Sequence, residues 1–153
     1  MKDRQLFKKL YDYIMKSDTR ISTETEKDFY LGTSNFLINV SYDKNLGLYP
    51  FNNTYVKELN GLGDSININS MNLESISLVR IEKNTDLKKT LYTFKHEDGT
   101  EIYADEKFFN LIPFNDVRYM VDTKKGVKNH NPIFVLDGYD NHLIAYIFPV
   151  VLK

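Results

Sequence analysis

The C-terminal stretch Asn131–Lys153, NPIFVLDGYDNHLIAYIFPVVLK, says more about the fold than any other part of the chain. Two apolar runs, Pro132–Asp137 and His142–Leu152, flank the turn residues GYDN, which is the pattern of a β-hairpin. An apolar final arm is expected where it lies in a sheet. Pro149 has no amide hydrogen to donate, so it must lie at an edge or at the end of the ladder. The pattern leaves open whether Pro149–Leu152 only packs in the core or also lines a groove for a partner.

Three other segments have the residue pattern of β-strands. Phe36–Asp43 alternates apolar and polar side chains, which predicts a strand buried on one face. Ser75–Lys83 carries apolar residues on both faces and is therefore expected in the centre of a sheet. Val117–Asp122 is a third strand. The Asn- and Gly-rich segment before the second of these strands is expected to contain many turns, with short strands near Thr54–Glu58 and Ser65–Asn69.

The clearest local signal is a hairpin in LYTFKHEDGTEIYA, residues 91–104. Asp98-Gly99 is a favoured pair for a two-residue type I′ turn, and it joins two runs of β-forming residues. This register places Phe94 opposite Tyr103, where an aromatic pair would stabilise the two strands. His96-Glu97-Asp98 then lies at the tip. An exposed tip offers no burial to shift a carboxyl pKa toward neutrality, so we expect a solvated turn rather than a catalytic group.

Helical patterns occur at three places. Near the N-terminus, apolar side chains recur at helical spacings and predict an amphipathic helix with one apolar stripe, formed by Leu6, Phe7, Leu10, Tyr11 and Ile14. Thr23 and Glu26 have capping-box spacing and predict a short helix as far as Leu31. Asp105 is expected to cap another short helix, which ends at Pro113 and turns one apolar side inward, formed by Phe108, Leu111 and Ile112.

These elements predict a single α+β domain over residues 1–153, with a mostly antiparallel sheet and two or three helices. The formal net charge of −1 gives no overall field that would attract nucleic acid or an anionic membrane. The chain contains no cysteine, which excludes disulfides and thiolate metal sites. It has neither a signal-peptide pattern nor an apolar run long enough to span a membrane, so we expect a cytoplasmic protein without membrane contact.

Exposed aromatic side chains are the first candidate binding feature. Most tyrosines and phenylalanines follow the apolar phase of a strand or helix and are expected in the core. Tyr49, Phe51 and Tyr55 lie in the irregular segment, and Tyr139 lies in the turn of the C-terminal hairpin. These four are expected to form an exposed patch for a protein or nucleic-acid partner, because tyrosine is enriched at both kinds of interface.

The N-terminal helix carries a second candidate, a basic face. Its cations could contact phosphates in a salt-dependent, sequence-independent way through Arg4, Lys8, Lys9 and Lys16. Two acidic residues, Asp3 and Asp12, interrupt this face, and a charged helix face is often simply solvated.

Motifs for catalysis or for a metal are absent from the sequence. His96, His130 and His142 lie at or beside turns and share no HxH or HxxxH spacing, so ordinary exposed turn histidines are expected, with no metal and no cofactor. A cluster of histidines with Asp116 or Asp137 in the folded chain is left open. Asn60–Ser65 holds two glycines but lacks the following helix and lysine of a phosphate loop, and a turn is the better interpretation. No GxSxG nucleophile motif occurs.

The C-terminal third resembles the last segment of a domain of the bacterial sliding clamp, the DNA polymerase III β subunit. TEIYADEKFFNLI resembles its strand and short helix, Asp116–Val121 its next strand, Asn131–Val135 its first hairpin arm, and Ile147–Leu152 its terminal strand. The family's ending is Pro-Val-Arg-Leu-like, whereas Val151 stands at the arginine position here. A clamp chain also has three such domains, and this chain has room for one. The resemblance implies a clamp-like α+β unit in which Pro149, Val150 and Leu152 line a groove for a partner's linear peptide.

We therefore expect a non-catalytic protein that acts by protein–protein binding on host DNA replication or defence machinery. It would be a clamp-like unit or an inhibitor such as an anti-CRISPR protein. A composition rich in Lys, Asn, Tyr and Ile fits a phage or another mobile element. One alternative is a direct nucleic-acid-binding protein that uses the basic helix face and exposed tyrosines. Another is a small enzyme whose site is assembled from distant Asp, Glu and His residues. Oligomerisation is left open.

Overall fold

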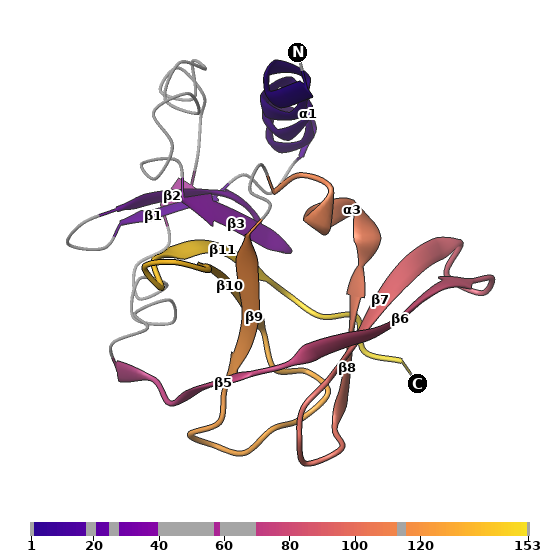
Figure 1. Ribbon diagram of the computed structural model, residues 1–153. Coiled ribbons are helices and arrows are strands. Elements are labelled where there is room, and N and C mark those ends of the chain that lie inside the picture. Colours follow the sequence, from indigo (N-terminus) through magenta and orange to yellow (C-terminus); the bar gives the residue numbers. More distant parts are fainter. Residues whose placement is uncertain are drawn as a thin grey trace.

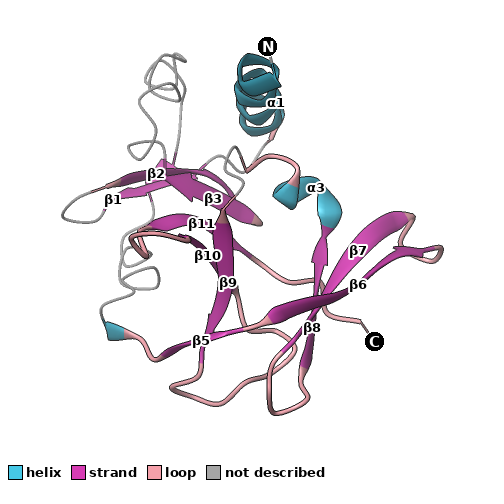
Figure 2. Ribbon diagram, in the orientation of Figure 1, coloured by secondary structure: helices cyan, strands magenta, loops and turns pink. Residues whose placement is uncertain are grey.

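Strands dominate the computed structural model, which describes residues 2–17, 21–24, 28–39, 57–58, 70–112 and 116–152. Within these ranges the chain forms two helices and eleven strands (Figures 1 and 2). Neighbouring strands are antiparallel in all pairs but one. The predicted α+β class with a mostly antiparallel sheet is therefore confirmed.

The larger of two sheets has eight strands in the order β4-β1-β2-β3-β11-β10-β9-β5. Their bounds are β1 Ile21–Glu24, β2 Phe29–Thr33, β3 Phe36–Asn39, β4 Lys57–Glu58, β5 Leu73–Ser75, β9 Val117–Asp122, β10 Ile133–Asp137 and β11 Leu143–Ile147. The C-terminal hairpin is confirmed as β10 and β11, and it lies inside this sheet between β3 and β9. All five residues of β11 are buried, which explains their uninterrupted apolar sequence.

The small sheet has three strands in the order β6-β7-β8, with bounds β6 Ser77–Asn84, β7 Lys89–Lys95 and β8 Glu101–Asp105. The chain passes from β5 to β6 through a single residue, Ile76, whose amide donates to the Tyr119 carbonyl of β9 at 3.0 Å. Strands β5 and β6 therefore run from the edge of the large sheet to the edge of the small one (Figure 1).

Two helices are described. Helix α1, Lys2–Lys16, buries Leu10 and Ile14 fully, in agreement with the predicted apolar stripe. Helix α3, Glu106–Phe109, begins after Asp105, whose side chain accepts a hydrogen bond from the Lys107 amide at 3.0 Å. The predicted N-cap is therefore confirmed, as is the burial of the apolar side formed by Phe108, Leu111 and Ile112.

Buried residues form two clusters, one on each face of the large sheet. The first contains Phe36 and Ile38 of β3, and it also takes in Phe94 and Ile102 of the small sheet, so one core joins the two sheets. The second contains Leu37 of β3 with residues of β10 and β11. All four residues of β3 are buried, so the prediction of a strand buried on one face only was wrong; Val40–Asp43 lie outside the described residues.

The helix expected from Thr23 to Leu31 was also wrong. The described residues of that stretch belong to strands β1 and β2, which pair antiparallel with Thr23 opposite Tyr30. A capping-box spacing is a local signal, and here the pairing of β2 with the buried strand β3 outweighs it.

The register of the β7–β8 hairpin differs from the prediction by one residue. The amide of His96 donates to the Thr100 carbonyl at 3.0 Å and that of Gly99 donates to the His96 carbonyl at 2.9 Å. The loop therefore has three residues, with Gly99 at φ +96°, rather than the two of a type I′ turn. Phe94 consequently pairs with Ile102, not with Tyr103, and both side chains face the core.

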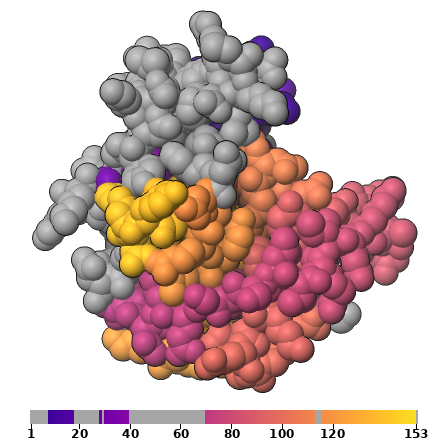
Figure 3. All heavy atoms as spheres, viewed as in Figure 1, coloured from indigo at the N-terminus to yellow at the C-terminus, as the bar shows by residue number. Residues whose placement is uncertain are grey.

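Strand β6 lies at an edge, whereas the sequence pattern of Ser75–Lys83 predicted a central position. Its residues from Ser77 to Lys83 are all exposed. In Figures 1 and 3 the β6–β7 hairpin projects from the rest of the described structure. The apolar residues of this strand, Leu78, Val79 and Ile81, therefore did not indicate burial.

Candidate functional site

The small sheet has two edges, and the C-terminal segment covers part of one. After β11 the chain leaves the large sheet, and the Val150 amide donates to the Tyr103 carbonyl of β8 at 2.7 Å. Pro149, Val150 and Leu152 are half-buried, and Val151 between the last two is exposed. Pro149 lies beyond the end of the β11 ladder, where a residue without an amide hydrogen is tolerated.

The opposite edge, strand β6, has no second strand beside it in the described part of the chain. Its backbone therefore presents unpaired donors and acceptors along one side. Leu78, Val79 and Ile81 are exposed there, Ile81 to 53% of its surface. A bulge interrupts the β6–β7 ladder between Leu78 and Arg80, so the regular part of this edge runs from Arg80 to Asn84.

The two faces of β6 differ in chemistry. Ile81 lies opposite Tyr92 and Leu78 lies opposite Phe94, on the face that packs into the core. Tyr92 stacks on Phe109 with ring centroids 4.6 Å apart, and Phe94 contacts the ring of Tyr119 at 4.9 Å. The apolar face of the small sheet thus continues from buried aromatic rings outward to exposed aliphatic side chains at its edge.

The other face of β6 is charged. Arg80 lies opposite Thr93 and Glu82 lies opposite Leu91. The guanidinium of Arg80 hydrogen-bonds to Glu101 of β8, and this bond raises the Arg80 pKa; a second carboxylate, Glu82, lies 3.8 Å away. An approaching strand would therefore meet Leu78, Ile81 and then Lys83 on one side, and a cation with two carboxylates on the other.

A polar cluster lies where the small sheet meets β5. The Nε2 of His96 lies 2.9 Å from Glu74 Oε1, and its Nδ1 lies 3.1 Å from Asp98 Oδ1. The Thr123 hydroxyl lies 3.0 Å from Glu74 Oε2. Burial by itself lowers the pKa of His96, but the hydrogen bonds and charges of the Glu74 and Asp98 carboxylates outweigh it, so the His96 pKa is raised.

His96 was expected to be an exposed turn histidine, and this was wrong because only 6% of its side chain is exposed. It directly follows β7 and its amide donates to the Thr100 carbonyl, so it continues the strand alternation and its side chain points inward like that of Phe94. His142, in contrast, is half-buried and lies 2.7 Å from Asp28, and His130 is exposed as predicted.

Among the described residues predicted for partner binding, Tyr139 is not brought together with the C-terminal segment. Tyr139 is 87% exposed in the β10–β11 turn, whereas Pro149 follows the far end of β11, so the two lie at opposite ends of that strand. Tyr49, Phe51 and Tyr55 lie outside the described residues. The predicted binding roles of Tyr139, Pro149, Val150 and Leu152 stay predictions.

Three of the four predicted nucleic-acid-binding residues can be located. Lys8, Lys9 and Lys16 are exposed on α1, away from the buried side chains of Leu10 and Ile14. Arg4 belongs to the same helix, but its side chain lies outside the described part of the structure. Exposure is what a phosphate-binding role requires, although it is also usual for lysine.

Sequence reasoning missed both the β6 edge and the contact between Glu74 and His96.

Neither helix described is of the length and apolar character needed to cross a membrane. The chain matches no family model, no curated protein and no solved structure with which it was compared. The function must therefore be inferred from the local geometry of the described residues.

Proposed function

We propose that the protein is non-catalytic and acts by binding an extended segment of a partner protein along β6. The observation that carries the proposal is an edge strand that no further described strand pairs with and whose apolar side chains, Leu78, Val79 and Ile81, are exposed. Exposed apolar edges promote aggregation unless they are protected or have a partner, and addition of a strand is a recurrent mode of peptide recognition.

The chemistry of β6 defines the partner segment. A strand added beside Arg80–Asn84 would alternate its side chains between the face that carries Ile81 and Lys83 and the face that carries Arg80 and Glu82. The fitting partner is therefore an extended peptide with alternating apolar and charged residues, its charges placed to meet Arg80 and Glu82. The bulge at Val79 shortens the regular edge and so disfavours unlimited stacking of identical copies.

Host DNA replication or defence machinery is the setting that we propose for this binding, in the cytoplasm, with the protein as a clamp-like unit or an inhibitor such as an anti-CRISPR protein. The resemblance of the C-terminal third to a sliding-clamp domain and the composition typical of mobile elements support this setting. In that case the partner would be a protein of the replication or defence machinery.

Affinity capture from the native host with matched variants tests the proposal. We expect a partner that wild-type protein retains and that the double variant Val79→Lys/Ile81→Lys loses, since two lysines place charge on the apolar edge. Leu87→Lys is the matched control, because Leu87 is also exposed but lies in the β6–β7 turn beyond the strand, and it should retain the partner.

Two rival results would contradict the proposal. Loss of the partner on Val151→Lys, with the β6 double variant unaffected, would place the binding site at the C-terminal segment. A mass of two chains in light scattering, lost in the β6 double variant, would show that a second copy of this chain pairs with the edge.

Direct nucleic-acid binding is a second candidate, favoured by the exposure of Lys8, Lys9 and Lys16 on one helix. Binding of a labelled duplex should then weaken steeply with salt, and Lys8→Glu/Lys9→Glu should reduce both the affinity and the salt dependence. Unchanged elution of the wild-type protein in the presence of DNA at low salt would exclude this candidate.

A further inference from the structure

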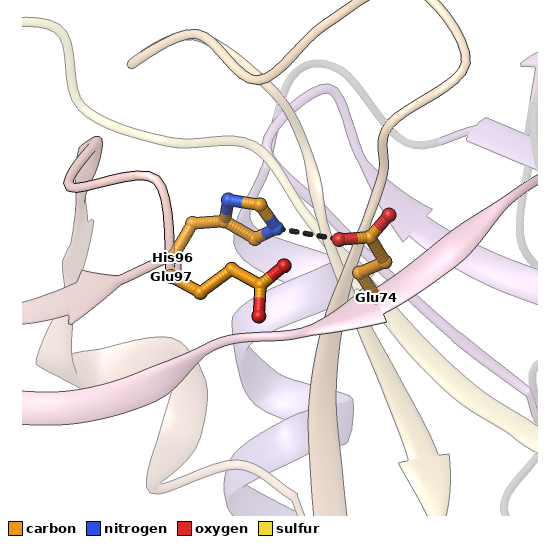
Figure 4. A group of neighbouring side chains, drawn as sticks. All are labelled: Glu74, His96 and Glu97. Atoms are coloured by element: carbon orange, nitrogen blue, oxygen red, sulfur yellow. Dashed lines mark hydrogen bonds and ion pairs between the residues drawn. The ribbon is translucent and has the colours of Figure 1, made fainter.

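Three potential metal ligands from two parts of the fold converge beside the junction of the sheets. Glu74 comes from β5, and His96 and Glu97 follow β7. One ligand atom from each lies within 4.8 Å of the other two. Figure 4 shows the His96 imidazole and the two carboxylates pointing toward a common centre. We propose that this cluster binds a divalent transition-metal ion, with Zn²⁺ the best match, and that the ion fastens the small sheet to the large one.

The ligand set fits zinc in number and in kind. Zinc accepts an imidazole nitrogen and carboxylate oxygens at about 2.0–2.2 Å, and open sites combine three protein ligands with a water molecule. Ligand atoms around a tetrahedral zinc lie about 3.4 Å apart at those bond lengths. The Nε2 of His96 and Oε1 of Glu74 are 2.9 Å apart, so a small separation of these two atoms would admit the ion.

Neighbouring groups are placed as outer-shell partners usually are. The carboxylate of Asp98 lies 3.1 Å from His96 Nδ1, where it would accept the Nδ1 hydrogen and leave the Nε2 lone pair free for the metal. The Asp98 amide also lies 3.3 Å from Nδ1, an arrangement that suits the other tautomer, in which Nε2 donates to Glu74. Metal binding would select the first tautomer.

The second ligand is oriented from a third segment. The Thr123 hydroxyl, just beyond β9, lies 3.0 Å from Glu74 Oε2 and leaves Oε1 facing His96. Such hydrogen bonds fix a carboxylate in the direction of the metal. Asp98 and Thr123 therefore constrain the two more buried ligands from different sides of the cluster.

Burial around the cluster is graded. His96 is buried, Glu74 is half-buried and Glu97 is exposed, so one side of the cluster is open to solvent. This side supplies a path for the ion and room for a water molecule as fourth ligand. Because Glu74 belongs to the large sheet and His96 directly follows β7 of the small one, a bound ion would add a cross-link between the two sheets.

Isothermal titration of the full chain with ZnCl₂, after removal of metal by a chelator, tests the site. We expect one zinc ion per chain and a melting temperature that rises with zinc concentration. His96→Gln should abolish binding, and Glu97→Gln should weaken it by about tenfold or more. Since Glu97 is exposed, its substitution should leave the fold intact and keep the test decisive if His96→Gln is unstable.

His142→Gln is the matched control. His142 also pairs with a carboxylate, that of Asp28, but the described residues form no three-ligand group there. Zinc binding should be unchanged in this variant. No stoichiometric binding by the wild type would show that Glu74 and His96 only pair with each other. Equal binding by Glu97→Gln and the wild type would show that zinc does not use this ligand set. Either result would overturn the proposal.

Discussion

The two edges of the small sheet differ in what pairs with them. On the β8 edge the C-terminal segment forms a backbone bridge through Val150, and Tyr103 of β8 is half-buried. On the β6 edge the described residues provide no strand, and the side chains of Leu78, Val79 and Ile81 are exposed. An edge covered by the chain's own terminus contrasts with one that is apolar and free, and the free edge is the better place to expect a partner.

The difference also shows why an apolar sequence is ambiguous. The sequences of β11 and β6 both contain closely spaced apolar residues, yet β11 is buried throughout and β6 is exposed from Ser77 to Lys83. In β11 the apolar residues pack in the core, whereas in β6 the described residues leave Leu78, Val79 and Ile81 exposed.

The largest expected effect is the difference in unfolding free energy between a core substitution and an edge substitution in the small sheet. Phe94→Ala should lower the free energy of unfolding by about 3–5 kcal/mol, because Phe94 is fully buried in the core that joins the two sheets. Ile81→Ala at the exposed edge should change it by about 0.5 kcal/mol or less. Urea unfolding measures both values, and equal losses would contradict the assignment of β6 as a free edge.

A somewhat smaller effect is expected at high pH from Tyr146 on β11, the strand that precedes the C-terminal segment. Burial raises the pKa of Tyr146 on β11 to about 12. The unfolded chain ionises this tyrosine near pH 10, so stability is lost as the pH rises from about 10 to about 12, by roughly 2–3 kcal/mol.

Urea unfolding at pH 9 and pH 12 measures this loss in the wild type and in Tyr146→Phe. The variant should lose less stability by about that amount, because its ring cannot ionise. The same loss in both proteins would mean that Tyr146 is accessible to water rather than buried.

The covered edge gives the next effect in size. Val150→Pro removes the amide that donates to Tyr103, which should cost about 1 kcal/mol and speed amide hydrogen exchange in β8. Val150→Ala is the control, since it shortens the side chain but keeps the amide. If the two variants exchange alike in β8, the backbone bridge does not protect that edge.

Removal of Val151–Lys153 should have the smallest effect on folding. Val151 is exposed, and the bridge at Val150 is retained. We expect a folded protein by circular dichroism. Unfolding would show instead that the last residues pack in the core, and a folded protein without its partner would favour the groove that the sliding-clamp resemblance implies.

Local signals predicted much of the fold correctly. Val117–Asp122, the N-cap at Asp105 and the C-terminal hairpin were found from nearby residues, because each depends on neighbours in the sequence. The β7–β8 register was wrong by one residue, since Asp98-Gly99 serves a three-residue loop as well as a two-residue one. The helix expected at Thr23 failed because pairing with a distant strand decides that segment.

The candidate sites were harder to predict from the sequence, because they also depend on contacts between segments that are distant in the chain. Glu74 and His96 are 22 positions apart, and their contact depends on the packing of β5 against the β7–β8 turn. One sequence feature could have predicted that the His96 side chain is buried: His96 continues the alternation in which Phe94 faces inward and Lys95 outward. The exposure of β6 follows only from the strand order of the small sheet.

Amide hydrogen exchange in β6, with and without the captured partner, tests the central claim most directly. The proposal requires slower exchange in Arg80–Asn84 when the partner is bound, because an added strand would pair with the free backbone groups of this edge. The Val79→Lys/Ile81→Lys variant should show no such change. Protection confined to α1 or to the C-terminal segment, with β6 exchanging as fast as before, would contradict the claim.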